Sequence, residues 1–417
     1  MSGRLLLIGP LPPPYGGTEV VTELLQKADW GAWPMSFFDS SKPIRNDERG
    51  KLRPKNVGLN MQKLSQLTKR LWVSRPSFVW LPLAQNVTGF LRDSAYVLLA
   101  RVMSARAVLH FNGATFDRFY AGRGPIFRWY VRLVLRRAHS IVVPADRLRS
   151  QFEDIQSQVP VFFLHNALTG SRYAALSSAP RTRRDGFNVV FIGHVSEAKG
   201  ALDLIRAVPK IVAAVPAFRL RLAGQIISDD SNSEFMDRAQ RKHSDPRVLA
   251  DEIGVTRFVD FLGPVSAERV VELLREADVF ALPSYSEGFS IAMLEAMAAG
   301  LPLVLTPVGA APEILAPNEN CLFVTPGSPP ALAEAVCRLA ADAGLRERMA
   351  EANRRLVSER FLEQHFSRRV AELTVLMFGG ARPKEFAADA RPDKPLGLAS
   401  KGDPIKPQDG GTQRPPA

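Results

Sequence analysis

The chain has 417 residues, of which 46% are hydrophobic and 23% are charged. This length suits two domains with sizeable cores, and the composition excludes an intrinsically disordered body. Two cysteines without a CxxC pair exclude a disulfide framework and a structural zinc site, and they favour a reducing compartment, the cytoplasm. The apolar run Leu5–Ile8 is too short for a signal peptide, and no stretch reaches the length of about 18 apolar residues that a transmembrane helix needs.

The net charge of +12 is concentrated in the first half of the sequence. Residues 1–180 contain 24 Lys and Arg against 11 Asp and Glu, whereas residues 181–417 contain 30 against 31. An anionic partner is therefore expected for the first half: membrane phospholipid, a phosphorylated acceptor or nucleic acid. No nucleic-acid-binding signature accompanies the charge, so no nucleic acid is expected as a partner. Solubility alone is the alternative explanation.

The first half of the chain alternates between predicted strands and helices. Residues 3–8 form an apolar strand, a Gly/Pro-rich loop follows to Gly17, and residues 18–25 have helical spacing, which is the opening of a βα unit. Further strands are predicted at residues 78–81, 107–111 and 140–143, with a helix over 127–138. This alternation predicts a parallel sheet.

A second set of alternating elements begins near residue 187. Strands are predicted at residues 188–192, 219–223, 259–262, 279–282 and 302–305, and helices at 202–212, 267–277, 290–299 and 331–341. The polar stretch 168–185 separates the two sets. From about residue 381, Pro, Gly, Lys, Asp and Gln dominate, which predicts a disordered tail.

The most informative segment is PSYSEGFSIAMLEAMAAGLP, residues 283–302. Glu287 is expected in the loop at the carboxyl end of a strand, where open α/β sheets bind ligands. Ser290 is a predicted N-cap, and the free N–H groups of residues 288–291 suit a phosphate. Glu295 is expected one to two turns inside the helix, where a carboxylate can accept hydrogen bonds from sugar hydroxyls. Alternatively, both glutamates are ordinary surface residues.

Glu287-x7-Glu295 resembles the E-x7-E signature of family-4 retaining glycosyltransferases, which contain a glycosyltransferase group 1 domain. The resemblance extends to ordered neighbouring segments, namely FIGH…EAKG from Phe191, LAG from Leu222, VDFLG from Val259 and TPVG…PE from Thr306. It implies the GT-B fold, an α/β architecture of two doubly wound Rossmann-like domains facing across a cleft.

The resemblance also suggests a domain organisation. We expect an acceptor-binding Rossmann-like domain over residues 1–170, a linker over 171–186 and a nucleotide-sugar-binding Rossmann-like domain over 187–360. A C-terminal helix over 361–380 is expected to return to the N-terminal domain, and 381–417 forms the disordered tail.

The implied site residues come from both halves. Glu287 is expected to hold the donor hexose, Glu295 the ribose, and Lys199 to neutralise the diphosphate leaving group. Gly288, Phe289 and Ser290 complete the expected donor-binding loop. His194 stands where the family usually has an Arg that helps to bind the diphosphate, so a neutral hydrogen-bond donor replaces a charge. A solvent-exposed loop lysine is the alternative for Lys199.

Two segments of the first half match the family in part. Gly16 and Gly17 correspond to its N-terminal glycine loop, where the backbone can approach a phosphate or sugar closely, although turns also use such a pair. His110 matches the first His of a His-x-His-Gly segment, and Asn112 stands in place of the second. His110 is therefore a candidate catalytic residue that contacts the donor sugar or the acceptor hydroxyl, or else a structural histidine.

The resemblance implies transfer with retention at the anomeric carbon and no metal or other cofactor besides the nucleotide-sugar co-substrate, a UDP- or GDP-sugar. The acidic pair Asp229-Asp230 lies in a polar segment and is interpreted as solvated. An inactive transferase-like binding module remains an alternative, as does a hydrolase or epimerase that acts on the free nucleotide sugar.

The segment 118–137 combines six arginines with aromatic and aliphatic residues. Arg128, Arg132 and Arg136 share one helix face at four-residue spacing. Such a helix can lie on an anionic membrane, or it packs on the sheet with its arginines outward. The expected acceptor is a glycan or lipid-linked intermediate of polysaccharide or lipopolysaccharide assembly. The expected location is the cytoplasm, peripheral on the inner face of the cytoplasmic membrane.

Overall fold

A computed structural model describes residues 4–13, 16–41, 54–155, 158–178, 185–227 and 245–379 of the chain. All of them belong to one compact unit. The expected tail 381–417 and the pair Asp229-Asp230 lie outside the described residues.

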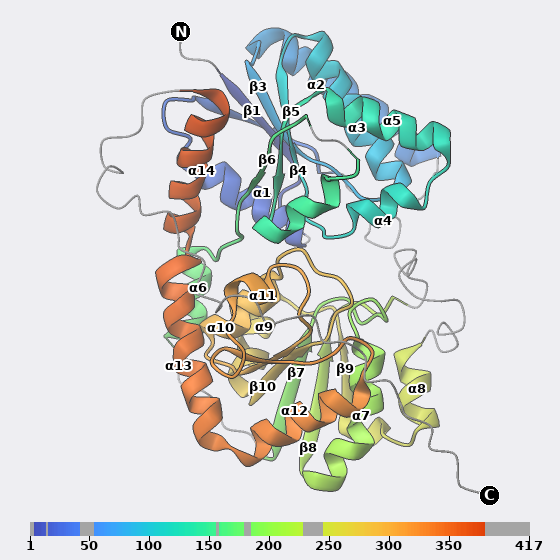
Figure 1. Cartoon of the computed structure of the whole chain (residues 1–417), viewed down its shortest axis with the longest axis vertical. Coiled ribbons are helices and arrows are strands. Elements are labelled where there is room, and N and C mark those ends of the chain that lie inside the picture. Colours follow the sequence, from blue (N-terminus) through green and yellow to red (C-terminus); the bar gives the residue numbers. More distant parts are fainter. Residues whose placement is uncertain are drawn as a thin grey trace, which may run out of the picture. The chain divides into compact units, whose positions relative to one another are not determined.

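The first half is built on a six-stranded sheet whose paired strands are all parallel (Figure 1). Its order is β2-β1-β3-β4-β5-β6. The strands are β1 (Leu5–Gly9), β2 (Met35–Asp39), β3 (Phe78–Pro82), β4 (Arg106–His110), β5 (Ala138–Val143) and β6 (Val161–Phe163). The helices are α1 (Gly17–Lys27), α2 (Pro54–Ser74), α3 (Val87–Val102), α4 (Phe116–Ala121), α5 (Pro125–Arg136) and the 3-10 helix η2 (Asp146–Phe152).

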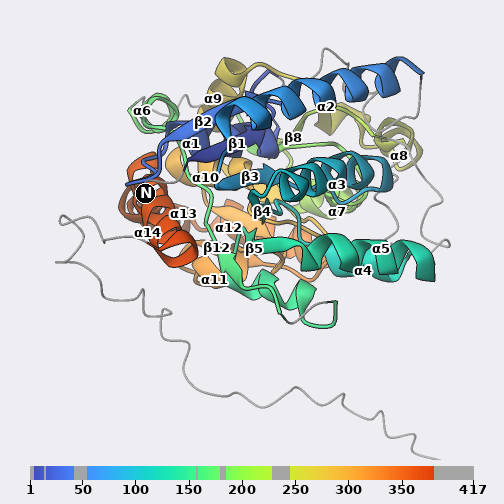
Figure 2. The same cartoon turned by 90° about the horizontal axis from the view of Figure 1, so that it is seen from above.

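Strand β1 explains how this sheet is covered on both faces. Its residues are all buried, and they alternate between two hydrophobic clusters because successive side chains of a strand point to opposite faces. Leu5 and Leu7 pack in the cluster that includes α1, whereas Leu6 and Ile8 pack in the cluster that includes α2, α3 and α5. Figure 2 shows α2, α3 and α5 side by side.

The second half contains another parallel six-stranded sheet, of order β12-β11-β10-β7-β8-β9. The strands are β7 (Phe187–Ile192), β8 (Phe218–Ala223), β9 (Val259–Gly263), β10 (Val279–Leu282), β11 (Leu303–Leu305) and β12 (Cys321–Phe323). The helices are α7 (Ala201–Ala214), α8 (Pro246–Glu252), η4 (Thr256–Phe258), α9 (Ala267–Glu276), α10 (Ile291–Ala298), α11 (Ala311–Ile314), α12 (Pro329–Ala341) and α13 (Ala343–Arg360). The predicted α/β class with two doubly wound sheets is confirmed.

Two helices lie on the chain segments that connect the halves. Helix α6 (Gly170–Ser177) follows β6, and α14 (Glu363–Phe378) follows α13. The two connections run beside each other, since Leu168 N–H donates to Phe361 O at 2.8 Å and Glu363 N–H donates to Leu168 O at 2.9 Å. Helix α14 then packs against α1, in the same cluster as Leu5 and Leu7.

The structure departs from the sequence expectations in several places. Strands β2, β6 and β12 were not predicted, and the polar connection contains α6. The predicted helix 127–138 corresponds to α5, and the basic segment 118–137 extends over both α4 and α5. Helix α7 contains Pro209 and continues to Ala214, two residues beyond the predicted end. Among the described residues, no helix combines the length and apolarity needed to cross a bilayer.

Candidate functional site

The strand order of the second sheet reverses direction at one position along its carboxyl edge. The chain proceeds outward from β7 through β8 to β9, and then returns to the other side of β7 with β10. Ligands of doubly wound sheets bind outside the carboxyl ends of the strands at such a reversal. The loops that leave this point are residues 193–200 after β7 and residues 283–290 after β10.

These two loops bring together the predicted Lys199 and Glu287. Lys199 Nζ lies 2.7 Å from Glu287 Oε1, and the Ser284 hydroxyl donates to the same oxygen at 3.0 Å. The side chains of Lys199 and Glu287 are 29% and 18% exposed, so the ion pair is partly shielded but accessible to a ligand. A backbone bond from Tyr285 N–H to Ala198 O, at 3.0 Å, also joins the loops. The site therefore presents an ammonium and a carboxylate side by side.

The backbone around Glu287 is packed too closely for larger residues. A Cβ atom on Gly288 would lie 2.0 Å from Asn112 O, and one on Gly309 would lie 2.2 Å from Glu287 O. Gly309 also has a φ of +59°, which L side chains rarely adopt. Ala310 N–H donates to Gly288 O at 2.8 Å. These contacts fix the conformation of the loop that presents the carboxylate.

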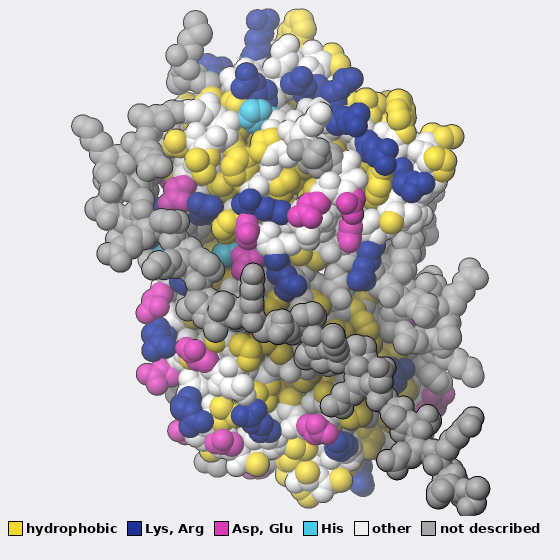
Figure 3. Space-filling view, viewed as in Figure 1, with side chains coloured by type: hydrophobic (Ala, Val, Ile, Leu, Met, Phe, Trp, Pro, Cys, Tyr) yellow, Lys and Arg dark blue, Asp and Glu magenta, His cyan; other side chains and the backbone are white. Residues whose placement is uncertain are grey.

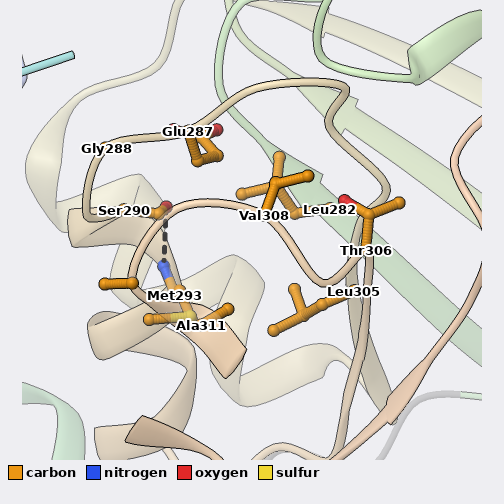
Figure 4. Close-up of a pocket in the computed structure, with 10 residues that line it drawn as sticks. Leu282, Glu287, Gly288, Ser290, Met293, Leu305, Thr306, Val308 and Ala311 are labelled. Atoms are coloured by element: carbon orange, nitrogen blue, oxygen red, sulfur yellow. Dashed lines mark hydrogen bonds between the residues drawn. The ribbon is translucent and has the colours of Figure 1, made fainter. Parts of the chain in front are cut away.

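A pocket lies behind this loop. It is small and partly open to solvent. Figure 4 shows Glu287, Gly288 and Ser290 along the loop that borders it, with Thr306 and Val308 on the loop across from them. Most of its lining is apolar, so the polar groups of the loop define where a polar ligand can bind.

Helix α10 begins as predicted at this loop. The Ser290 side chain accepts a hydrogen bond from Met293 N–H at 3.2 Å, as a predicted N-cap should. Phe289 is buried, and its carbonyl oxygen accepts a hydrogen bond from Asn166 Nδ2 at 2.9 Å. The N-terminus of α10 is thus held next to Glu287, where its dipole favours a negatively charged ligand.

Glu295 lies inside α10 and is paired with a residue that the sequence analysis did not select. Arg172 Nε of α6 lies 2.6 Å from Glu295 Oε1, and Arg172 Nη1 donates to Ala267 O at 2.7 Å. Burial raises the pKa of Glu295 above its usual value, and Arg172 offsets only part of this rise. The carboxylate is therefore held in one orientation by a cation from the connecting helix.

His194 follows Gly193 in the loop after β7 and is exposed. Gly193 comes very close to the loop after β8, because a Cβ atom on Gly224 would lie 1.7 Å from Gly193 O. The structure places His194 on the same loop as Lys199.

Gly16 and Gly17 stand at the start of α1, after β1. No side chain caps this helix, and Glu19 of its first turn is buried. A Cβ atom on Gly16 would lie 2.5 Å from Glu19 Oε2. A buried carboxylate at this position repels a phosphate group, and it can accept hydrogen bonds from the hydroxyl groups of a ligand.

His110 ends β4 and is only 1% exposed. Trp80 Nε1 donates to His110 Nδ1 at 3.3 Å, so the proton of the neutral ring is on Nε2. Burial lowers the pKa of His110 to about 4. Nε2 is buried and has no hydrogen-bond partner among the described residues. His110 is thus a neutral hydrogen-bond donor near pH 7 rather than a cation.

Glu313 joins the second half to residues of the first. Its carboxylate accepts hydrogen bonds from Asp146 N–H at 3.2 Å and Arg147 N–H at 3.1 Å, and it lies 3.0 Å from His165 Nε2. Burial raises the pKa of Glu313, but the bonds to His165 and to the two N–H groups outweigh it, and the pKa is lowered. Glu313 therefore binds the start of η2.

The structure brings Lys199, Glu287, Gly288 and Ser290 together, with Glu295 on the following helix. Arg172 contacts Glu295, Ser284 contacts Glu287, and Trp80 contacts the candidate residue His110. None of these three partners was predicted as a site residue. Arg172 belongs to a segment interpreted as a linker, and no sequence signal used in the prediction marked it as an ordered position. Within the described ranges, no cluster of three or more His, Cys, Asp or Glu suited to a metal ion is found.

Comparison with known proteins identifies the second half. Residues 176–356 match the family model described as glycosyl transferases group 1. This part of the chain is a group 1 glycosyltransferase domain. The chain is 35% identical over 173 residues to an uncharacterized glycosyltransferase of Methanocaldococcus jannaschii, a match that covers 42% of this chain and 40% of that protein. It is 34% identical over 161 residues to the D-inositol 3-phosphate glycosyltransferase of Corynebacterium jeikeium, covering 39% and 37% of the two chains. The chain thus matches only about two fifths of the length of these relatives.

Solved structures resemble both halves of the chain. Sucrose-phosphate synthase of Thermosynechococcus elongatus aligns with a TM-score of 0.66 at 18% identity, covering 91% of this chain and 100% of the other. Anabaena HepE, solved with UDP and glucose, aligns with a TM-score of 0.62 at 15% identity, covering 89% and 99%. The predicted GT-B fold of two Rossmann-like domains is confirmed.

Proposed function

We propose that the protein is a glycosyltransferase that moves a sugar from a UDP- or GDP-sugar to an acceptor hydroxyl. The observation that carries this proposal is the Lys199–Glu287 pair at the reversal point of the second sheet, 2.7 Å apart. An ammonium can neutralise a diphosphate, and a carboxylate can accept hydrogen bonds from sugar hydroxyls. The pair therefore offers adjacent contacts to the two parts of a nucleotide sugar. HepE, which shares the fold, was solved with UDP and glucose.

Each of these groups is assigned to one part of the donor. Glu287 holds the hexose, Lys199 and the N-terminus of α10 stabilise the diphosphate, and Glu295 holds the ribose. Transfer proceeds with retention: the bond from the anomeric carbon to the phosphate oxygen breaks, and the bond to the acceptor oxygen forms on the same face. The acceptor proton passes to the departing phosphate, so no side-chain base is needed. Lys199 supplies the positive charge, and the reaction uses no metal ion or other cofactor.

The first half of the chain suggests the class of acceptor. Most of the exposed large hydrophobic side chains that the structure describes lie on α2, α3 and α5, and Trp72, Ile126 and Trp129 are 65%, 83% and 63% exposed. Helices α2 and α5 contain no acidic residue, and Asp93 of α3 is buried and paired with Arg92. Figure 3 shows a row of Lys and Arg side chains beside hydrophobic ones on the side of the first half where α5 lies.

A surface with both exposed tryptophans and unbalanced positive charge fits an anionic membrane. We therefore propose a lipid-linked or polysaccharide intermediate of cell-envelope glycan assembly as the acceptor. The protein would act peripherally at the inner face of the cytoplasmic membrane.

A thermal-shift screen of UDP- and GDP-sugars tests the donor, followed by transfer assays on those that bind. A ligand at 100 times its Kd stabilises a protein by about 2.7 kcal/mol. No shift with any nucleotide sugar would refute the proposal. Hydrolysis of the donor at the same rate with and without acceptor would indicate a hydrolase instead. Glu295→Ala should weaken donor binding while the protein stays folded, and unchanged kinetics would exclude the ribose role.

A further inference from the structure

The guanidinium of Arg172 connects three parts of the structure. It belongs to α6, on the segment between the two sheets, and it contacts the Glu295 carboxylate of α10 and the Ala267 carbonyl at the start of α9. Thr169 caps α6 and accepts from Arg172 N–H at 3.3 Å, which fixes the backbone of Arg172 as well. The side chains of Arg172 and Glu295 are 19% and 12% exposed. This is a shielded ion pair with defined geometry on both sides.

We infer that Arg172 is a positioning residue that keeps Glu295 ionised and oriented for the nucleotide. The inference rests on the proposed function, because it assigns Arg172 a role in the same donor site. Arg172 occupies Oε1 of Glu295 at 2.6 Å. The other oxygen, Oε2, is then directed by the same contact and is available to accept hydrogen bonds from ribose hydroxyls.

The electrostatic reason is the burial of the carboxylate. An acid in a low-dielectric environment takes up a proton unless a cation or hydrogen bonds stabilise its charge. Burial raises the pKa of Glu295, and the proximity and hydrogen bond of Arg172 counteract this. A protonated Glu295 would lose the charge that makes it a strong acceptor for hydroxyl groups.

Other charged residues near Glu295 do not replace Arg172. Glu268 of α9 is acidic and interacts with Arg172 itself. Arg354 of α13 faces the opposite end of α10, where its Nη2 donates to Ala299 O at 3.4 Å. Within the described part of the chain, Arg172 is the cation that contacts the Glu295 carboxylate directly.

The test compares Arg172→Gln with the wild type and with a matched control, Arg275→Gln. Arg275 Nη2 donates to Ala175 O at 3.2 Å, so it also joins α9 to α6 but does not contact Glu295. The Kd of UDP and of GDP is measured by calorimetry between pH 5.5 and 8.5. The ratio of each variant's Kd to that of the wild type cancels the titration of the nucleotide itself.

We expect Arg172→Gln to weaken nucleotide binding relative to the wild type increasingly as the pH falls below the Glu295 pKa of the variant, by up to about tenfold per unit, until the wild-type Glu295 also takes up a proton. Arg172→Lys should restore most of the affinity, and Arg275→Gln should follow the wild type at every pH. A pH-independent ratio for Arg172→Gln, tighter binding by this variant, or the same pH trend in Arg275→Gln would overturn the inference. If the wild type binds neither nucleotide, the proposed donor fails instead.

A second measurement needs no nucleotide. In Arg172→Gln the folded-state pKa of Glu295 rises further above its unfolded value, so the variant loses stability at neutral pH and regains it as the pH falls through that pKa. We expect its melting temperature to approach that of the wild type on acidification. Adding Glu295→Gln should remove the pH dependence. An equal difference in melting temperature at pH 5 and pH 8 would contradict the role of Arg172.

Discussion

At the scale of single residues, both glutamates of the candidate site are held by a cation from another segment. Glu287 is paired with Lys199 from the loop after β7, and Glu295 with Arg172 from α6. Neither cation is near its partner in sequence. In the proposed function, Lys199 binds the diphosphate of the ligand and Glu287 binds its hydroxyl groups. Both charges are already in position before the ligand binds.

Lys199→Ala should lower the rate of sugar transfer by about 10²–10³-fold, because charge stabilisation of the leaving group is lost. A donor KM that rises while kcat stays unchanged would mean that Lys199 contributes only to ground-state binding. Lys210→Ala is the control, since Lys210 pairs with Glu334 on the exposed surface, 2.7 Å away. Steady-state kinetics with the donor identified by the screen give both constants, and an unaffected Lys199→Ala enzyme would contradict the assigned role.

The buried, neutral ring of His110 leads to a prediction about the pH dependence of the reaction. Its pKa of about 4 keeps the ring neutral across the working range of most enzymes. We expect the pH profile of kcat between pH 5.5 and 9 to have the same shape in the wild type and in His110→Gln, although the absolute rate can differ. A wild-type inflection near pH 6 to 7 that disappears in His110→Gln would show that His110 titrates during catalysis, which the buried geometry opposes.

At the scale of elements, the sequence patterns predicted the central strands and the edge strand β9, and they missed the edge strands β2, β6 and β12. Strand β10 consists of continuous buried apolar residues, and β7 is apolar and buried over most of its length, which is visible in the sequence. Strand β2 lies at one edge of its sheet and is only partly buried, and β6 and β12 have three residues each. Short or half-exposed strands carry too little periodicity to be recognised.

The candidate site was predicted where a local pattern defines it. The adjacent sequence predicts that Ser290 precedes an apolar helix and that Glu287 follows a strand. Arg172 could not be found in this way, because its partner is 123 residues away in sequence and the pairing depends on how α6 packs against α10. Likewise, the burial of His110 follows from its contact with Trp80 of the neighbouring strand.

The basic surface of α5 yields a prediction for an element. Arg132 and Arg136 are exposed on a helix that also exposes Trp129. Replacing both arginines by Glu should abolish co-sedimentation with vesicles rich in anionic phospholipid at low salt, because each basic residue contributes about 1 kcal/mol near such a surface. The charge-matched control replaces Arg348 and Arg355 of α13. Equal sedimentation of the two double variants would rule out α5 as the membrane-binding element.

At the scale of the whole chain, the C-terminal helix belongs to the sheet formed by the N-terminal residues. Helix α14 contributes Phe366, Val370 and Leu373 to the cluster that contains Leu5 and Leu7. Asp29 N–H, just after α1, donates to the Ser367 hydroxyl at 2.7 Å. The chain therefore crosses between the two halves twice, and the crossings are hydrogen-bonded to each other near Leu168. The hydrophobic core of the first half therefore includes residues that follow the second sheet in the sequence.

Phe366→Ala should consequently destabilise the first half, although the residue is more than 300 positions from β1 in the sequence. Phe366 is 3% exposed, and removing a buried phenylalanine ring costs about 3–5 kcal/mol. Leu376→Ala is the matched control, because Leu376 is on the same helix but 59% exposed and should change stability by less than about 0.5 kcal/mol. Chemical denaturation followed by tryptophan fluorescence reports on the first half directly, since Trp30 and Trp80 lie in the same cluster as Phe366. If Phe366→Ala and Leu376→Ala unfold at the same denaturant concentration, α14 does not stabilise the first sheet, because the buried ring would then contribute no more than an exposed one.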